Sequence, residues 1–149
     1  MAEETNLIAS WLTPLLAADS AGAGSLGVLS TGITGRIYDT VIPQEETTYP
    51  LIVFNVQSAT DLMTISRGGS RVWVNTLTQV KVVGKDQAFS ELTAIAGRID
   101  QLIHQSSGST TGGTIVQCTR EQIIRYIEPV GALIYRHLGG LFRVIAQAA

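Results

Sequence analysis

Few side chains in this sequence combine the residue types and the spacing that catalysis or metal binding requires. The two histidines, His104 and His137, fall in different predicted elements, and neither has a second metal-ligand residue at a useful spacing. Cys118 is the single cysteine, so the chain can form neither an internal disulfide nor a cysteine-based zinc site. In a predicted strand, Cys118 is most simply a small buried apolar residue. We therefore expect no catalytic residue, no metal site, no cofactor and no enzymatic activity.

The other familiar chemical motifs are also missing from the sequence. The glycine-rich stretch that ends at Gly35 is not a phosphate-binding loop, because Arg36 and Ile37 follow where such a loop needs lysine and a hydroxyl residue. No Gly-x-Ser-x-Gly segment marks a serine nucleophile. Glu45 and Glu46 are adjacent in a polar segment, where two carboxylates are ordinarily solvated surface. The glycine-rich stretch is better interpreted as a flexible loop.

Composition favours assembly with other proteins over binding to nucleic acid. Lysine and arginine number 10 and the acidic residues 12, giving a formal net charge of -2, whereas nucleic-acid-binding domains usually have a clear basic excess. Charged residues make up only 15% of the chain, against about 25% in typical domains, and 45% of the residues are hydrophobic. Such sparse charge suits a surface that neighbouring subunits cover. The acidic N-terminus and the lack of a long apolar run predict synthesis in the cytoplasm, without a membrane span.

The chain has the length of one domain, spanning residues 1–149. Apolar residues at helical spacing predict a helix over residues 3–18, with Thr5 as a candidate cap and with Pro14 producing a kink or a junction of two short helices. A small, glycine-rich loop follows over residues 21–34. A second helix is predicted over residues 86–105, with Asp86 as its cap.

Strand patterns occupy most of the remaining chain. The clearest is residues 71–83, in which every second residue is β-branched and the opposite face carries Trp73 and Leu77. The Gly139-Gly140 pair predicts a bulge or a close backbone contact in the last strand. The sequence thus predicts an α+β fold, a largely antiparallel sheet with two helices packed on one face, in the order α-β-β-β-α-β-β. The five strands are predicted over residues 36–39, 50–60, 71–83, 114–128 and 132–147.

Several residues are candidates for contacts between subunits rather than for chemistry. Trp73 and Leu77 share the face opposite the β-branched one, which either meets another molecule or is covered by one of the helices. Residues 58–70 and 106–113 read as long loops, which are often binding elements. The arginines of the two last strands either face a polyanion or pair with carboxylates across a subunit boundary, and the second interpretation suits arginine better. These arginines are Arg120, Arg125, Arg136 and Arg143.

Several segments, in their order and spacing, resemble the tail terminator (tail completion) proteins of long-tailed bacteriophages. The helix pattern with Ile95, Ile99-Asp100 and Leu102-Ile103-His104 belongs to this resemblance, which covers most of the chain from residue 35 onward. The segment 21–34 departs from the family's pattern. The other resembling segments are residues 35–39 (GRIYD), 49–54 (YPLIVF), 80–84 (VKVVG) and 135–144 (YRHLGGLFRV).

The resemblance implies a structural virion protein of a siphophage-like tail. Such proteins form a ring, typically a homohexamer, that caps the head-proximal end of the tail tube, ends tube polymerisation and joins the tail to the head or neck. The implied partners are other copies of the chain, the tail tube protein and a neck or head-completion protein. DNA would pass through the lumen without recognition of its sequence. Contacts with subunits or the tube would then fall to Met63, Arg67, Trp73 and Leu77, and inter-subunit pairing to Arg136 and Arg143.

Three alternatives stay open at the level of the sequence. The first is another neck component, such as a connector or stopper, or a tube component, because these proteins share folds and sizes. The second is a small enzyme or ligand-binding domain, which would need a pocket with convergent polar groups. The third is a DNA-binding module, whose affinity would fall steeply with salt.

Overall fold

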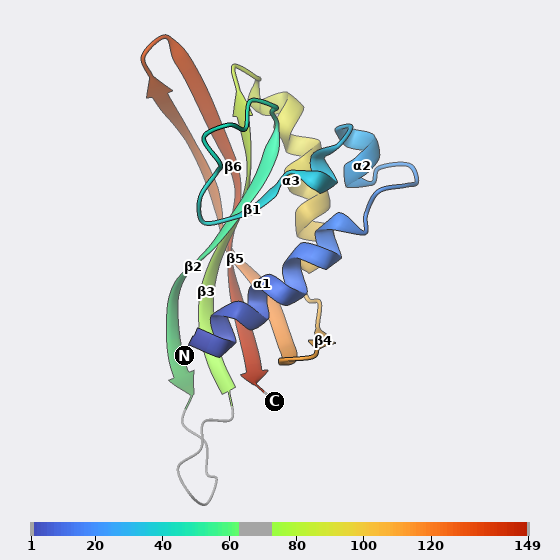
Figure 1. The fold of residues 1–149 in the computed structure, drawn as a ribbon, viewed down its shortest axis with the longest axis vertical. Helices are drawn as coiled ribbons and strands as arrows, with labels where there is room; N and C mark the ends of the chain where they lie inside the picture. The colour runs from blue at the N-terminus through green and yellow to red at the C-terminus, as the bar shows by residue number, and fades with distance from the viewer. Residues whose placement is uncertain (1, 63–72, 149) are drawn as a thin grey trace, which may run out of the picture.

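A computed structural model describes residues 2–62 and 73–148, and in it the chain forms one curled, six-stranded sheet with three helices (Figure 1). The sheet order is β1-β2-β3-β6-β5-β4. Every neighbouring pair is antiparallel except β1 and β2, so the prediction of an α+β fold with a largely antiparallel sheet is confirmed. The strands are β1 Ile37–Asp39, β2 Leu51–Leu62, β3 Trp73–Lys85, β4 Gly108–Thr110, β5 Gly113–Val130 and β6 Leu133–Ala148.

One layer of helices packs on the sheet and encloses the main core. The helices are α1 Ala2–Ala17, α2 Leu26–Leu29 and α3 Phe89–Ile103, with a 3-10 turn, η1, at Ile33–Gly35. On β3 the alternate residues from Val74 to Val82 face this layer and are buried, as the β-branched pattern predicts. Side chains of α1 and α3 join them in a single cluster, which includes Ile8, Leu12, Leu92, Ile95, Ile99, Phe54, Val80, Phe142 and Val144.

The predicted element order is incomplete, because short elements occur where loops were expected. The predicted loop 21–34 contains α2 and η1, which each bury one apolar residue, Leu26 and Ile33. Asp19 holds this segment to α3: its carboxylate accepts hydrogen bonds from the Leu26 amide at 2.8 Å and from the Arg98 guanidinium at 2.8 and 2.9 Å. The Arg98 hydrogen bond lowers the pKa of Asp19 below its usual value. The predicted loop 106–113 likewise contains β4, which pairs with the start of β5.

The predicted helix boundaries also need correction. α1 begins at Ala2 and runs through Pro14 as one helix, so Thr5 lies inside it and does not cap it. The residue before α3 is Ala88, whose amide donates to the Glu91 carboxylate at 3.0 Å. Asp86 does not cap α3; its carboxylate instead accepts a hydrogen bond from the Ile134 amide on β6. Asp86, which the sequence suggested as a helix cap, therefore binds the sheet instead.

The last strands depart from regular pairing in a way the sequence did not predict. Both register shifts fall in β5, between Ile115 and Gln117 and between Arg120 and Gln122. The Gly139-Gly140 pair on β6 keeps regular register, so the expected bulge is wrong, while the expected close backbone contact is confirmed. The second shift in β5 changes which residues face the helices beyond it.

Candidate subunit interface

Among the described residues, neither core cluster extends over the middle of the sheet face opposite the helices. We call this surface the open face; its residues belong to neither core cluster. Strand pairing brings its members together, because Leu77 lies opposite Arg143 on the neighbouring strand. Trp73 has 41% of its surface exposed, and its indole nitrogen donates to the Gln147 side chain at 3.2 Å. The open face consists of Trp73 and Leu77 on β3, Leu141, Arg143 and Ile145 on β6, and Ile124 on β5.

Arg143 is fixed on the open face by hydrogen bonds within the chain. Its guanidinium donates to both carboxylate oxygens of Glu121, at 2.8 and 3.0 Å, and to the Asn75 side chain at 3.3 Å. The Arg143 hydrogen bond lowers the pKa of Glu121. A forked pair of this kind holds its geometry better than a single contact. The result is a charged, ordered group beside the apolar side chains of the open face.

Arg136 lies on the other face of β6, toward the helices. Its guanidinium donates to the Gln87 carbonyl oxygen at 2.9 Å and lies 5.9 Å from the centre of the Phe89 ring. The Arg125 guanidinium packs on the same ring at 4.2 Å. The arginines of the two last strands therefore do not share one face of the sheet.

The six residues that sequence reasoning selected are thus only partly brought together. Trp73, Leu77 and Arg143 share the open face, and Arg136 does not. Met63 and Arg67 lie outside the described residues.

The sequence did not suggest a polar network that lies on the same side of the sheet as the open face. The Lys81 ammonium donates to the Tyr126 hydroxyl at 2.6 Å, and the Tyr126 ring stacks on His137 with ring centres 4.3 Å apart. His137 Nε2 lies 2.9 Å from the Glu128 carboxylate and, since a carboxylate only accepts, carries the proton. His137 is 5% exposed, and burial lowers its pKa, with a further contribution from Lys81.

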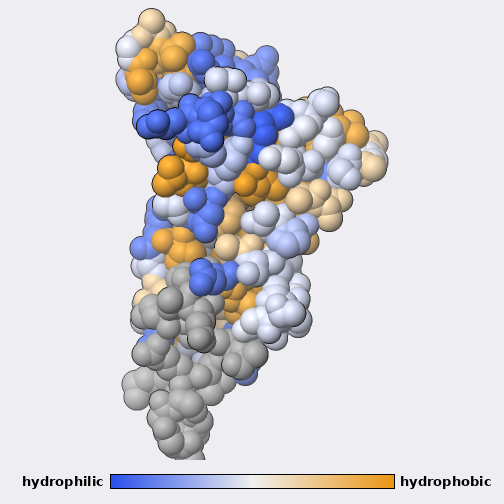
Figure 2. Space-filling model, viewed as in Figure 1, coloured by the Kyte–Doolittle hydropathy of each residue, from blue (hydrophilic) through white to orange (hydrophobic). Residues whose placement is uncertain are grey.

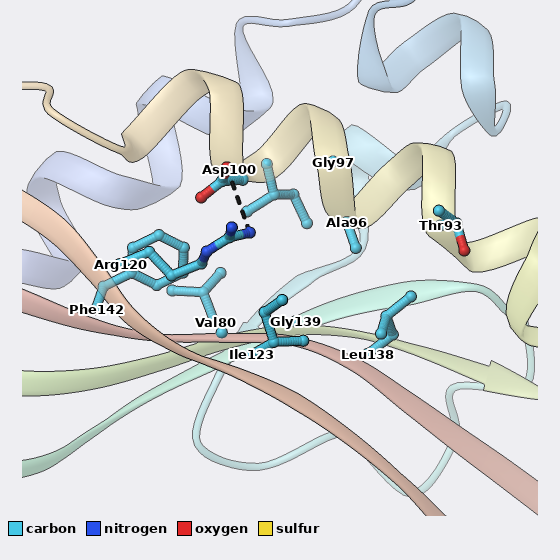
Figure 3. Close-up of a pocket in the computed structure, with 12 residues that line it drawn as sticks. Val80, Thr93, Ala96, Gly97, Asp100, Arg120, Ile123, Leu138, Gly139 and Phe142 are labelled. Carbon is cyan, nitrogen blue, oxygen red and sulfur yellow. Dashed lines mark ion pairs between the residues drawn. The ribbon is translucent and has the colours of Figure 1, made fainter.

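An apolar groove lies on the helix side, between α3 and the β5–β6 pair (Figure 3). Its volume is about 190 Å³, and the Asp100–Arg120 ion pair, at 3.4 Å, closes one end. In Figure 3, Thr93, Ala96 and Gly97 line it from α3, and Ile123 and Leu138 approach from the strands. Ile123 has 67% of its surface exposed although it lines the groove. The groove therefore opens at the β5 edge of the sheet.

Further apolar side chains gather at the turn of the β5–β6 hairpin. Ile127 is 53% exposed and Val130 49% exposed, and Ile134 is also exposed. Figure 2 shows this apolar cluster at the top end of the molecule. Together with the open face and the groove, it is surface that suits contact with other proteins.

Chemistry of other kinds finds little support in the described part of the chain. No three His, Cys, Asp or Glu side chains among residues 2–62 and 73–148 are placed to hold a metal ion. Burial raises the pKa of the Cys118 thiol to about 12, which leaves it protonated at neutral pH. None of the described helices has the length and apolarity needed to cross a membrane.

Comparison with known proteins gives a fold likeness without a sequence family. No protein-family model matches this sequence, and no curated protein sequence matches it. Among solved structures, the chain is similar to a chain of the virion of a native gene transfer agent (GTA) particle, with a TM-score of 0.70 at 13% sequence identity. The similarity covers 95% of this chain and 97% of that chain, so the two share a fold over nearly their whole lengths.

Proposed function

We propose that this chain is a structural protein of a phage or phage-like virion. The observation that carries the proposal is the fold shared, end to end, with a chain of a gene transfer agent virion. The low charge content and the open face with Trp73 and Leu77 support it, because both suit a protein whose surface is covered on assembly. The role is therefore binding of other virion proteins rather than catalysis.

Within that class, we propose the role of a tail terminator. Copies of the chain form a ring, a hexamer in the family it resembles, at the head-proximal end of the tail tube. The ring ends tube polymerisation and offers its other side to a neck protein. Trp73 and Leu77 on the open face meet a neighbouring subunit or the tube, and Arg143 takes part from the same face. Met63, Arg67 and Arg136 remain candidates for the same contacts.

Deletion of the gene for this chain from the phage or phage-like genome that carries it tests this role. Electron microscopy of the deletion lysate should show overlong tails, because nothing stops tube growth, and complementation in trans should restore the normal length. Tails of normal length that are unattached to heads would contradict the terminator role. They would favour instead a connector or stopper protein of the neck.

A further inference from the structure

The groove between α3 and β5 lies beside a stretch of β5 whose outer side pairs with no described strand. At its start, β5 is flanked by β4, which pairs only with residues 113–115. The end of α3 then covers the edge: the Gln105 amide donates to the Cys118 carbonyl at 2.6 Å, and the Arg120 amide donates to His104 Nδ1 at 3.0 Å. Beyond Arg120, no described strand pairs with this side of β5. We call residues 123–127 the free edge of β5.

The free edge directs its unpaired backbone groups outward, away from β6, and lies beside the groove. Val130 and Leu133 close the two-residue turn of the hairpin and form a hydrogen-bonded pair. Along an antiparallel pair of strands, hydrogen-bonded residue pairs alternate with non-hydrogen-bonded pairs. Counting back from Val130, the backbone N–H and C=O groups of Ile123, Arg125 and Ile127 therefore point away from β6. The side chains of the same three residues project on the helix side, where Ile123 lines the groove. An added strand would thus find backbone partners and an apolar recess together, as in recognition by strand addition.

We propose that this edge and groove bind a strand of a second copy of the chain, namely the free part of β2. β2 has β3 on one side, but on its other side β1 pairs only with residues 52–54. Among the described strands, β2 therefore carries the other long unpaired edge, on the opposite side of the same sheet. A contact between two different edges is head-to-tail and propagates from copy to copy, as a ring requires. This inference rests on the proposed function.

The two edges match in face and charge. The irregularity in β2 lies between Val56 and Ser58, so the pairing of residues 58–62 with β3 is regular. No lysine or proline protects β2 within this stretch. Asp61 is the only charged residue of β2, and it pairs with Val74 on the helix side of the sheet. In a continuous sheet, Asp61 would lie on the same face as Arg120 and Arg125 of the next copy.

Pairing of two β5 edges with each other is the competing arrangement, and charge disfavours it. Arg125 lies at the centre of residues 123–127, so a two-fold pairing would set two copies of Arg125 opposite each other. Like charges directly opposite on neighbouring strands are destabilising. Such a contact would also close as a dimer and leave the edge of β2 unused.

Filling the groove tests the contact with little risk to the fold. Gly97 lines the groove from α3, and a Cβ placed there meets nothing within 4 Å. Gly97→Leu should therefore leave the helix intact, since leucine favours helix over glycine, while its side chain occupies the groove. The matched control is Ala94→Leu, which adds the same side chain to an exposed position of α3 outside the groove.

Analytical ultracentrifugation of the purified chain, up to its highest soluble concentration, gives the readout. We expect the wild type to form assemblies larger than a dimer. Gly97→Leu should weaken association at least about tenfold, and Ala94→Leu should not change it. A chain that stays monomeric, one that stops at a dimer, or equal effects of the two variants would overturn the inference.

A charge swap gives a second, independent test. Asp61→Arg and Arg125→Asp should each weaken association, and the double variant should recover most of the loss. Failure of the double variant to recover would count against the pairing of these edges. Deletion of the gene separates this inference from the proposed function. Overlong tails with no effect of Gly97→Leu would keep the terminator role and refute the edge contact, whereas normal tails with a specific Gly97→Leu defect would do the reverse.

Discussion

Gly139 on β6 has no room for a side chain. A Cβ added there would lie 2.1 Å from the Val80 carbonyl oxygen and 2.5 Å from the Lys81 Cα, both of them backbone atoms of β3. The missing side chain also leaves open the path by which Lys81 reaches the Tyr126 hydroxyl across β6. A single glycine therefore sets both the approach of two strands and the polar network beside them.

We predict that Gly139→Ala destabilises the fold by at least about 2 kcal/mol, because overpacking against backbone cannot be relieved by a side-chain rotation. Urea unfolding followed by circular dichroism measures the free energy of unfolding. Gly97→Ala is the control: the space there is open and the helix should gain up to about 1 kcal/mol. Equal stability of the two alanine variants would contradict the close contact at Gly139.

Stability should also depend on the protonation of His137. In the fold, its Nδ1 is buried with no acceptor among the described residues, so a second proton would leave an unsatisfied N–H. Burial, with a further contribution from Lys81, lowers the pKa of His137 in the folded chain below its value in the unfolded chain. A base of this kind stabilises the fold above its unfolded pKa, near 6.5, and stability falls as the pH drops through and below that value.

We expect the free energy of unfolding to fall between pH 7.5 and pH 5.5, with a contribution from His137 of at most about 1.4 kcal/mol per pH unit. His137→Gln should be less stable at pH 7.5 but should show a flatter dependence on pH. The difference between the two profiles isolates the contribution of His137 from that of all other groups. Parallel profiles would show that His137 does not carry the dependence.

At the scale of elements, regular patterns made the longest segments predictable. The β-branched alternation of β3 has period two and identifies one buried face without reference to the rest of the chain. The apolar stripe of α3 predicts its buried residues in the same way, and Leu92, Ile95, Ile99 and Ile103 are indeed buried. Local side-chain periodicity was sufficient in both elements because each buries one continuous face.

Elements without such a pattern could not be predicted. α2 and η1 are too short for a periodic signal and depend on tertiary contacts, above all those of Asp19 with Leu26 and Arg98. The pairing of β4 with β5 involves only three residues, in a segment whose composition is typical of loops. Asp86 offered a plausible cap, but a backbone amide of β6 competes for the same carboxylate.

The candidate surfaces were predictable to the same extent as the strands that carry them. Trp73 and Leu77 are an even number of residues apart on one regular strand, and side chains on a strand alternate between its two faces, so their shared face was predictable. The groove does not, because the second register shift in β5 places Ile123, rather than Gln122, on the helix side. The network around His137 joins three strands, so no spacing within one segment could reveal it.

The molecule as a whole presents different surfaces on different sides. The helices cover one face of the sheet, the open face lies opposite, and free edges occur on β2 and β5. A protein that works alone would be expected to cover or protect more of this surface. A subunit that joins neighbours on two sides and another protein on a third needs these surfaces left free.

The open face is therefore the place to test assembly as a whole. We predict that Leu77→Asp, on the open face, reduces incorporation of the chain into virions at least about tenfold, because it introduces a charge that must lose its hydration when this surface is buried on assembly. Trp73→Ser, at a more exposed position, should act in the same direction with less effect on folding. Val28→Asp on α2 introduces the same charge at an exposed apolar residue away from the open face and should have no effect. Quantitative immunoblotting of gradient-purified particles measures incorporation, and thermal unfolding confirms that each variant is folded. Normal incorporation of folded Leu77→Asp and Trp73→Ser would exclude the open face as an assembly surface and leave only the free edges and the hairpin turn.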